Sequence, residues 1–194
     1  MKLEKSKKPT EGKKNQGKLL LSKLKENDHE AFIEAYDLYV DQIYRFVYFK
    51  ISNQEDAQDL TSVVFLKTWN YIRENSLKDV RTLRALMYKV ARNSVIDHYR
   101  KKFQTDLSID QEGGMDIADR SQDIARKMEI KSDFKIIENK LRELKDEYRE
   151  IIVLRFIDEL SVKEIAEIIE KSNSNVRVII HRALKTLKKS LEEG

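Results

Sequence analysis

A cluster of basic residues near the C-terminus has the composition and spacing to bind nucleic acid. No Asp or Glu occurs between Lys171 and Leu191 to neutralise the cluster. On a helical wheel its members lie on one face: Arg177, His181, Arg182, Lys185, Lys188 and Lys189. Arginine can present a planar fork to guanine O6 and N7, whereas lysine neutralises phosphates. Val178 lies in the middle of this face and offers methyl groups to thymine.

The opposite face of the same segment is apolar, which is typical of an amphipathic helix packed on a core. Its residues lie within an arc of about 140° at the helical period. They are Val176, Ile179, Ile180, Ala183, Leu184, Leu187 and Leu191. We therefore expect a helix that buries one side and presents cations on the other.

A second short helix is predicted immediately before this one. Ser161 and Glu164 have the spacing of a capping box, in which each side chain bonds to a backbone N–H of the other residue. Small Ala166 permits a close helix crossing, and residues 171–174 form a polar turn with Ser172 or Ser174 as cap. This helix-turn-helix pattern predicts that the basic helix enters the major groove of DNA. The alternative is a surface helix whose exposed side is basic but binds nothing. The capped helix immediately before it argues against this alternative.

The composition predicts an all-α protein. The 194 residues include five Gly, one Pro and no Cys, so disulfides, thiolate metal sites and thiol catalysis are excluded. The three histidines, His29, His98 and His181, are far apart and have no partner at ligand spacing. We therefore expect no catalytic site, no metal, no cofactor and no enzyme activity. The sequence has neither the ~20-residue apolar run of a membrane span nor a signal peptide, which predicts a cytoplasmic protein without membrane insertion.

Charge and aromatic content divide the chain into two helical domains joined by a flexible acidic linker. Residues 1–18, with seven Lys and two Glu, are predicted to form a disordered basic arm. An N-terminal helical domain is expected over 19–102, with a short entry helix near 19–24 and longer helices near 30–51, 54–73 and 83–102. Residues 103–131 are acidic and polar and read as the linker. Residues 132–194 should form a four-helix domain that contains the helix-turn-helix.

Three strings in this order resemble a sigma factor of bacterial RNA polymerase, of the extracytoplasmic-function (ECF) kind. Residues 56–60 (DAQDL) with Phe65-Leu66-Lys67 resemble the second conserved region of that family. Residues 86–93 (LMYKVARN) with 97–100 (DHYR) resemble its promoter-melting segment. Residues 164–169 (EIAEII) with 181–185 (HRALK) resemble its fourth region.

The resemblance implies partners and site residues. It implies that Asp59, Leu60 and Phe65 bind the clamp helices of core RNA polymerase. Asn93, Arg100 and the loop 75–80 would lie near the melted minus-ten strand of promoter DNA. In the helix that reads the minus-35 element, the positions that face bases and phosphates would be occupied by Arg177, Val178, His181 and Arg182.

Three further points follow from the residues or the family. From its basic neighbours, Tyr99 is a candidate for stacking on an unpaired base, with core packing equally open. Glu170 stands where such turns usually carry glycine. Family members are commonly held inactive by an anti-sigma factor, although no residue here points to one. The alternative function is a stand-alone helix-turn-helix regulator whose N-terminal domain binds a partner.

Overall fold

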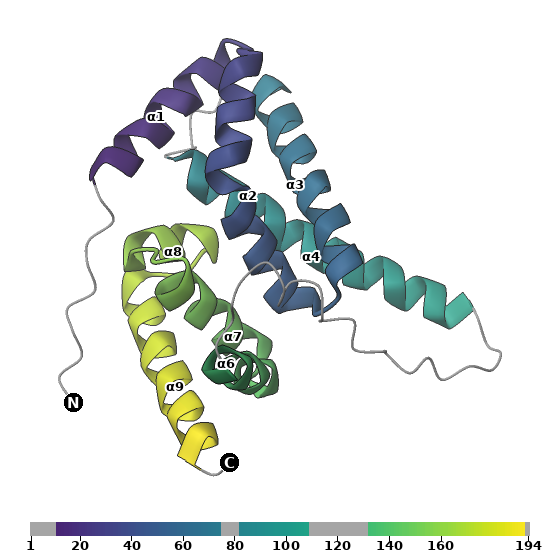
Figure 1. Ribbon diagram of the computed structural model, residues 1–194, viewed down its shortest axis with the longest axis vertical. Coiled ribbons are helices and arrows are strands. Elements are labelled where there is room, and N and C mark those ends of the chain that lie inside the picture. The colour runs from purple at the N-terminus through teal and green to yellow at the C-terminus, as the bar shows by residue number, and fades with distance from the viewer. Residues whose placement is uncertain (1–10, 75–81, 109–131, 193–194) are drawn as a thin grey trace.

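The computed structural model describes residues 11–74, 82–108 and 132–192 (Figure 1). Within these ranges the chain is helical and contains no strand, which confirms the all-α prediction. Two groups of helices, one from each half of the chain, lie against each other (Figure 1). The part of the expected linker after residue 108 lies outside the described residues, as do the loop 75–81 and residues 1–10.

The N-terminal domain consists of α1 (Glu11–Lys25), α2 (His29–Ile51), α3 (Gln54–Glu74) and α4 (Leu83–Ser108). α2 packs on α1, α3 and α4, which explains why its aromatic residues are spread around the helix. In the core, the ring of Phe46 meets Tyr88 edge-on at 5.3 Å, and neither residue is exposed. Edge-to-face aromatic pairs of this kind stabilise cores beyond their buried area.

Side-chain caps set the limits of α2 and α3. The Asp28 carboxylate accepts hydrogen bonds from the backbone N–H groups of Glu30 and Ala31, at 2.9 and 3.1 Å. α2 ends at Ser52, which adopts the left-handed conformation with φ 60°. The Asn53 side chain then accepts from the Asp56 N–H at 2.9 Å at the start of α3. These short polar residues satisfy backbone groups that a helix end leaves without partners.

Two predicted boundaries of this domain are wrong. Residues 11–18 were expected in the disordered arm, but α1 begins at Glu11. The reason is packing: Leu20 and Leu24 are buried, and Gly17 lies so close to the Tyr39 hydroxyl that a Cβ would approach it to 2.7 Å. Residues 103–108 were expected in the linker, but α4 continues to Ser108. That stretch contains neither Gly nor Pro, so nothing stops helix propagation.

The C-terminal domain has the predicted four helices. They are α6 (Ser132–Glu143), α7 (Asp146–Ile152) continuing into a π-helical turn η1 (Val153–Ile157), α8 (Val162–Ile168) and α9 (Asn173–Glu192). α9 packs on α6, α7 and α8. Their shared core contains Leu141, Leu154, Ile165, Ile168 and Val176, each at most 1% exposed.

Candidate nucleic-acid interface

The predicted capping box starts α8. The Ser161 Oγ accepts from the Glu164 N–H at 3.3 Å, and the Glu164 carboxylate accepts from the Ser161 N–H at 2.9 Å. The inner face of α8 is buried, with Ile165 at 0% and Ile168 at 1% exposure. The first helix of the motif is therefore fixed both by its cap and by its core contacts.

The turn between α8 and α9 is built around a residue in the left-handed conformation. Glu170 has φ 56°, which a side chain other than glycine adopts only at a cost of about 1–3 kcal/mol. Next, the Lys171 N–H donates to the Ala166 carbonyl at 3.1 Å. The Ser172 Oγ accepts from the Asn175 N–H at 3.2 Å, so Ser172, one of the two predicted candidates, caps α9.

The apolar face of α9 is buried over its first half only. Val176, Ile179 and Ala183 are at most 8% exposed and face α7 and α8. Leu184 and Leu191 were expected on this inner face, yet they are 39% and 46% exposed. Leu184 lies at the edge of the predicted arc, and after Ala183 only the partly buried Leu187 packs on the core.

The basic face of α9 is exposed. All five residues predicted to contact DNA there are in contact with solvent, and Val178 keeps 47% of its surface exposed. Among the described residues, no carboxylate lies within 4 Å of Arg177, Arg182 or Lys185. The solvent-facing residues are Arg177, Val178, His181, Arg182 and Lys185. These residues have the charge to bind DNA, and Arg177, Arg182 and Lys185 have no ion pair among the described residues to displace.

The second predicted DNA site lies on α4. Asn93 and Arg100 are exposed and share a face, because seven residues are two helical turns. Tyr99 faces α2 instead, where its hydroxyl donates to the Lys50 carbonyl at 2.8 Å. Burial raises the pKa of this hydroxyl, which keeps it protonated as a donor. Tyr99 as a whole is still 38% exposed, so part of the residue remains accessible.

The residues predicted to bind polymerase lie on α3, and one of them is placed differently from expectation. Asp59 is exposed and Leu60 is half-buried. Phe65 is only 3% exposed and its ring packs on Tyr36 at 4.7 Å, so it has no surface to offer a partner. The prediction for Phe65 as a contact residue is wrong, because the inner side of α3 is needed for the core.

Sequence reasoning missed the apolar residues that α3 does expose. Val63 and Leu66 are 38% and 59% exposed and lie four and seven residues after Asp59, on the same helical face. Together with Asp59 they give this side of α3 an apolar and acidic character. Helical period could have identified Val63 and Leu66 as exposed, because both lie outside the apolar stripe of α3 that includes Val64 and Phe65.

Comparison with known proteins assigns both domains. Residues 35–104 match the family model for sigma-70 region 2, and residues 134–187 match the one for sigma-70, region 4. The chain is 31% identical over 183 residues to the ECF RNA polymerase sigma factor SigW of Bacillus subtilis, covering 89% of this chain and 95% of that protein. The chain belongs to the ECF sigma factors. A sigma factor binds core RNA polymerase and directs transcription initiation at promoters.

Solved structures show the same fold as this sigma factor. CnrH, in complex with the cytosolic domain of CnrY, has a TM-score of 0.69 at 19% identity and covers 92% of this chain and 98% of CnrH. RpoE of Bartonella quintana, in complex with the anti-sigma factor NepR, has a TM-score of 0.62 at 20% identity, covering 83% and 96%. In this sigma factor, no helix among the described residues is long and apolar enough to cross a membrane.

Proposed function

We propose that this sigma factor divides promoter recognition between α9 and α4 and attaches to polymerase through α3. The observation that carries the proposal is the exposure of Arg177, Arg182 and Lys185 on α9, which have no carboxylate within 4 Å among the described residues and follow a capped and well-packed α8. The same chain presents exposed polar residues on α4 and an exposed apolar and acidic face on α3. Three surfaces on one chain match the three contacts that initiation requires.

α9 reads the minus-35 element in the major groove. Arg177 and Arg182 each present a fork to a guanine, a contact that contributes about 1–3 kcal/mol of discrimination. Val178 contacts a thymine methyl, and His181 lies between the two arginines along the helix. Lys185 and Lys188, nearer the C-terminus, neutralise phosphates and add affinity without sequence preference.

α4 captures the melted minus-ten strand. The Asn93 side chain can donate hydrogen bonds to a base edge and accept them from it. Arg100, two helical turns later, neutralises a phosphate of the same DNA strand. Tyr99 stacks a face of its ring on an unpaired base while its hydroxyl stays bonded to the Lys50 carbonyl. The hydrogen bond to the Lys50 carbonyl holds the Tyr99 ring in one orientation, which lowers the entropic cost of stacking.

The α3 face formed by Asp59, Val63 and Leu66 docks on the clamp helices of core polymerase. Burial of Leu66, which is 59% exposed, contributes binding free energy, and the neighbouring Asp59 carboxylate favours one orientation of the contact. The chain would then act in the cytoplasm, where polymerase works, and would have no catalytic activity of its own. An anti-sigma factor is a further expected partner, as NepR is for RpoE of Bartonella quintana.

Reconstituted transcription tests the proposal. Core polymerase with and without the purified protein is given fragmented genomic DNA, and the transcripts are sequenced. We expect new start sites that share a sequence motif about 35 base pairs upstream and appear only with the protein. Tight sequence-specific binding by the free protein, with no stimulation of polymerase, would instead support the stand-alone regulator.

A further inference from the structure

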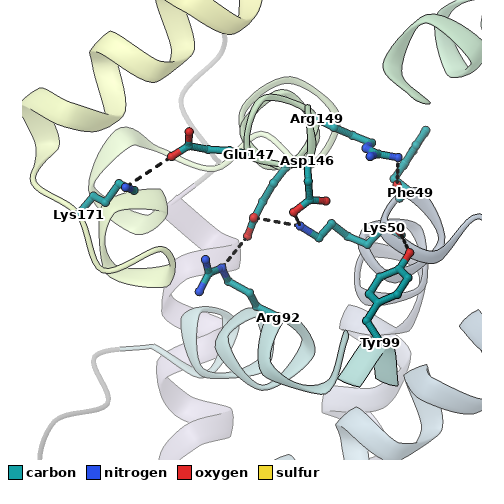
Figure 2. Close-up of polar contacts among 9 residues, drawn as sticks. Phe49, Lys50, Arg92, Tyr99, Asp146, Glu147, Arg149 and Lys171 are labelled. Atoms are coloured by element: carbon teal, nitrogen blue, oxygen red, sulfur yellow. Dashed lines mark hydrogen bonds and ion pairs between the residues drawn. The ribbon is translucent and has the colours of Figure 1, made fainter. Parts of the chain in front are cut away.

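The first turn of α9 carries amide and hydroxyl side chains and no cation. α9 begins at Asn173, and residues 172–175 are Ser-Asn-Ser-Asn, all of them exposed. The cation just before them, Lys171, points back to α7, where its Nζ lies 3.5 Å from Glu147 Oε1 (Figure 2). This end of α9 therefore presents hydrogen-bonding groups rather than charge.

Asn175 uses its backbone in the cap of α9 and leaves its side chain free. In α8 the capping box is reciprocal, because Ser161 and Glu164 each accept a hydrogen bond from the backbone N–H of the other. In α9 only one half of such a box is present: the Ser172 Oγ accepts from the Asn175 N–H at 3.2 Å. The Asn175 side chain forms no hydrogen bond with any described residue, and it is exposed. Its amide can therefore both donate to and accept from another molecule.

Asn175 lies on the same side of α9 as two of the residues proposed to read bases. At about 100° per residue, Arg182 is about 20° away from Asn175 after two turns, and Val178 is about 60° away one turn on. The three residues are exposed and have the spacing i, i+3 and i+7, so they form one row along the helix. Val176 and Ile179, which alternate with them, are at most 8% exposed and hold this part of α9 on the core.

The start of α9 can come close to the bases. In helix-turn-helix proteins the N-terminal residues of the second helix contact base edges in the major groove. Asparagine is short and needs a close approach of the backbone, which the equally short side chains of Ser172 and Ser174 allow. A serine hydroxyl donates and accepts alike and pairs with several base edges, so Ser174 distinguishes them poorly. Asn175 is then the residue of the first turn that can select a base.

We propose that Asn175 reads an adenine of the minus-35 element, an inference that rests on the proposed function of α9. The Asn175 Nδ2 donates to adenine N7 and its Oδ1 accepts from the adenine N6 amino group, a bidentate pattern that adenine alone matches in the major groove. Seven residues of helix rise about 10.5 Å, or about three base pairs at 3.4 Å each. The adenine therefore lies about two or three base pairs from the guanine read by Arg182, with the thymine that contacts Val178 between them.

The diagnostic variant is Asn175→Asp. An ionised carboxylate has nearly the shape of the amide but only accepts hydrogen bonds. It loses the donor for adenine N7 and matches the N4 amino group of cytosine instead. An acid in the first turn of a helix also interacts favourably with the helix dipole, so the variant keeps its fold. Asn175→Ala, which removes both hydrogen-bonding groups, is the second variant.

Asn173→Asp is the matched control. It makes the same change of side chain and charge two residues earlier, at a position that is also exposed. Nine residues separate Asn173 from Arg182, which places it about 180° around α9, on the other side of the helix. A new negative charge near DNA weakens binding to every template, and this control measures that common effect.

Transcription from a promoter with a randomised upstream element measures base preference at each position. Templates that carry a barcode in the transcribed region are mixed, transcribed by core polymerase with each variant, and counted by sequencing the RNA. The parent protein and Asn173→Asp should prefer adenine over cytosine at one position by about 5–150-fold. Asn175→Ala should lose that preference, and Asn175→Asp should favour cytosine there. The preference at the other positions should stay as in the parent protein.

Arg182→Ala, transcribed in parallel, separates this inference from the proposed function. If Arg182→Ala loses preference at its own position while both Asn175 variants keep the parent preference for adenine, the proposal is overturned and the proposed function stands. If neither Arg182→Ala nor Asn175→Ala changes preference at any position, both fail. An Asn175→Ala protein that unfolds at lower urea and keeps every base preference would show that Asn175 serves only the helix start.

Discussion

Phe65 and Leu66 are adjacent in the sequence, and the structure predicts opposite consequences for their replacement. Phe65 is 3% exposed and packs on Tyr36, whereas Leu66 is 59% exposed on the outer face of α3. Removing a buried phenylalanine ring leaves a cavity and costs about 3–5 kcal/mol of folding free energy. Phe65→Ala should therefore lose a large part of the stability of its domain.

Leu66→Ala should leave the free energy of unfolding within about 0.5 kcal/mol of the parent value, as surface substitutions do. If Leu66 is buried against the clamp helices, the methine carbon and two methyl groups lost correspond to about 1–1.5 kcal/mol, or roughly tenfold weaker binding to core polymerase.

Urea unfolding followed by circular dichroism measures the stability difference, and titration of labelled protein with core polymerase measures the affinity. The two positions serve as controls for each other, because the same substitution is made one residue apart. The assignment of α3 would be refuted if Phe65→Ala stayed fully folded and lost polymerase binding while Leu66→Ala changed neither quantity.

Three further predictions concern α3 and the helix-turn-helix. Asp59→Ala should weaken binding to core polymerase without changing stability; unchanged affinity in the same titration would remove Asp59 from the docking face. Ser161→Ala removes the cap of α8 and should cost about 1 kcal/mol in urea unfolding, and an unaltered midpoint would contradict that role. Glu170→Gly replaces a left-handed residue at φ 56° by glycine and should raise the free energy of unfolding by up to about 1 kcal/mol; a lower free energy of unfolding would contradict this and show that the Lys89–Glu170 ion pair contributes more than the strain.

Local signals in the sequence were sufficient for the helix-turn-helix. The capping box of Ser161 and Glu164, a serine cap for α9 and the basic face of α9 depend on residues within a few positions of one another, although the choice of Ser172 over Ser174 came from the structure. Such features form through hydrogen bonds and helical period alone, so the sequence determines them directly. The same reasoning located α2 and α3 through their polar ends.

Features that depend on contacts between distant segments were not predictable in this way. Helical period shows that Phe65 and Leu66 differ in orientation, but not which of them the core needs. Leu184 and Leu191 belong to the apolar pattern of α9, yet both are exposed, which the pattern alone does not reveal. Lys50 lies in an aromatic helix and its carboxylate partners, Asp146 and Glu150, follow about one hundred residues later, so nothing near it in the sequence reveals the contact between the two domains.

The central claim is that the exposed basic face of α9 selects the promoter, and base preference at the minus-35 element measures it most directly. A promoter found by transcript sequencing is varied at each upstream position and transcribed with the parent protein, with Arg182→Ala and with Lys188→Ala. We predict that Arg182→Ala loses preference at one or two adjacent positions, by about 5–150-fold, while Lys188→Ala weakens all templates alike. Parent-like preference at every position in Arg182→Ala would contradict the account.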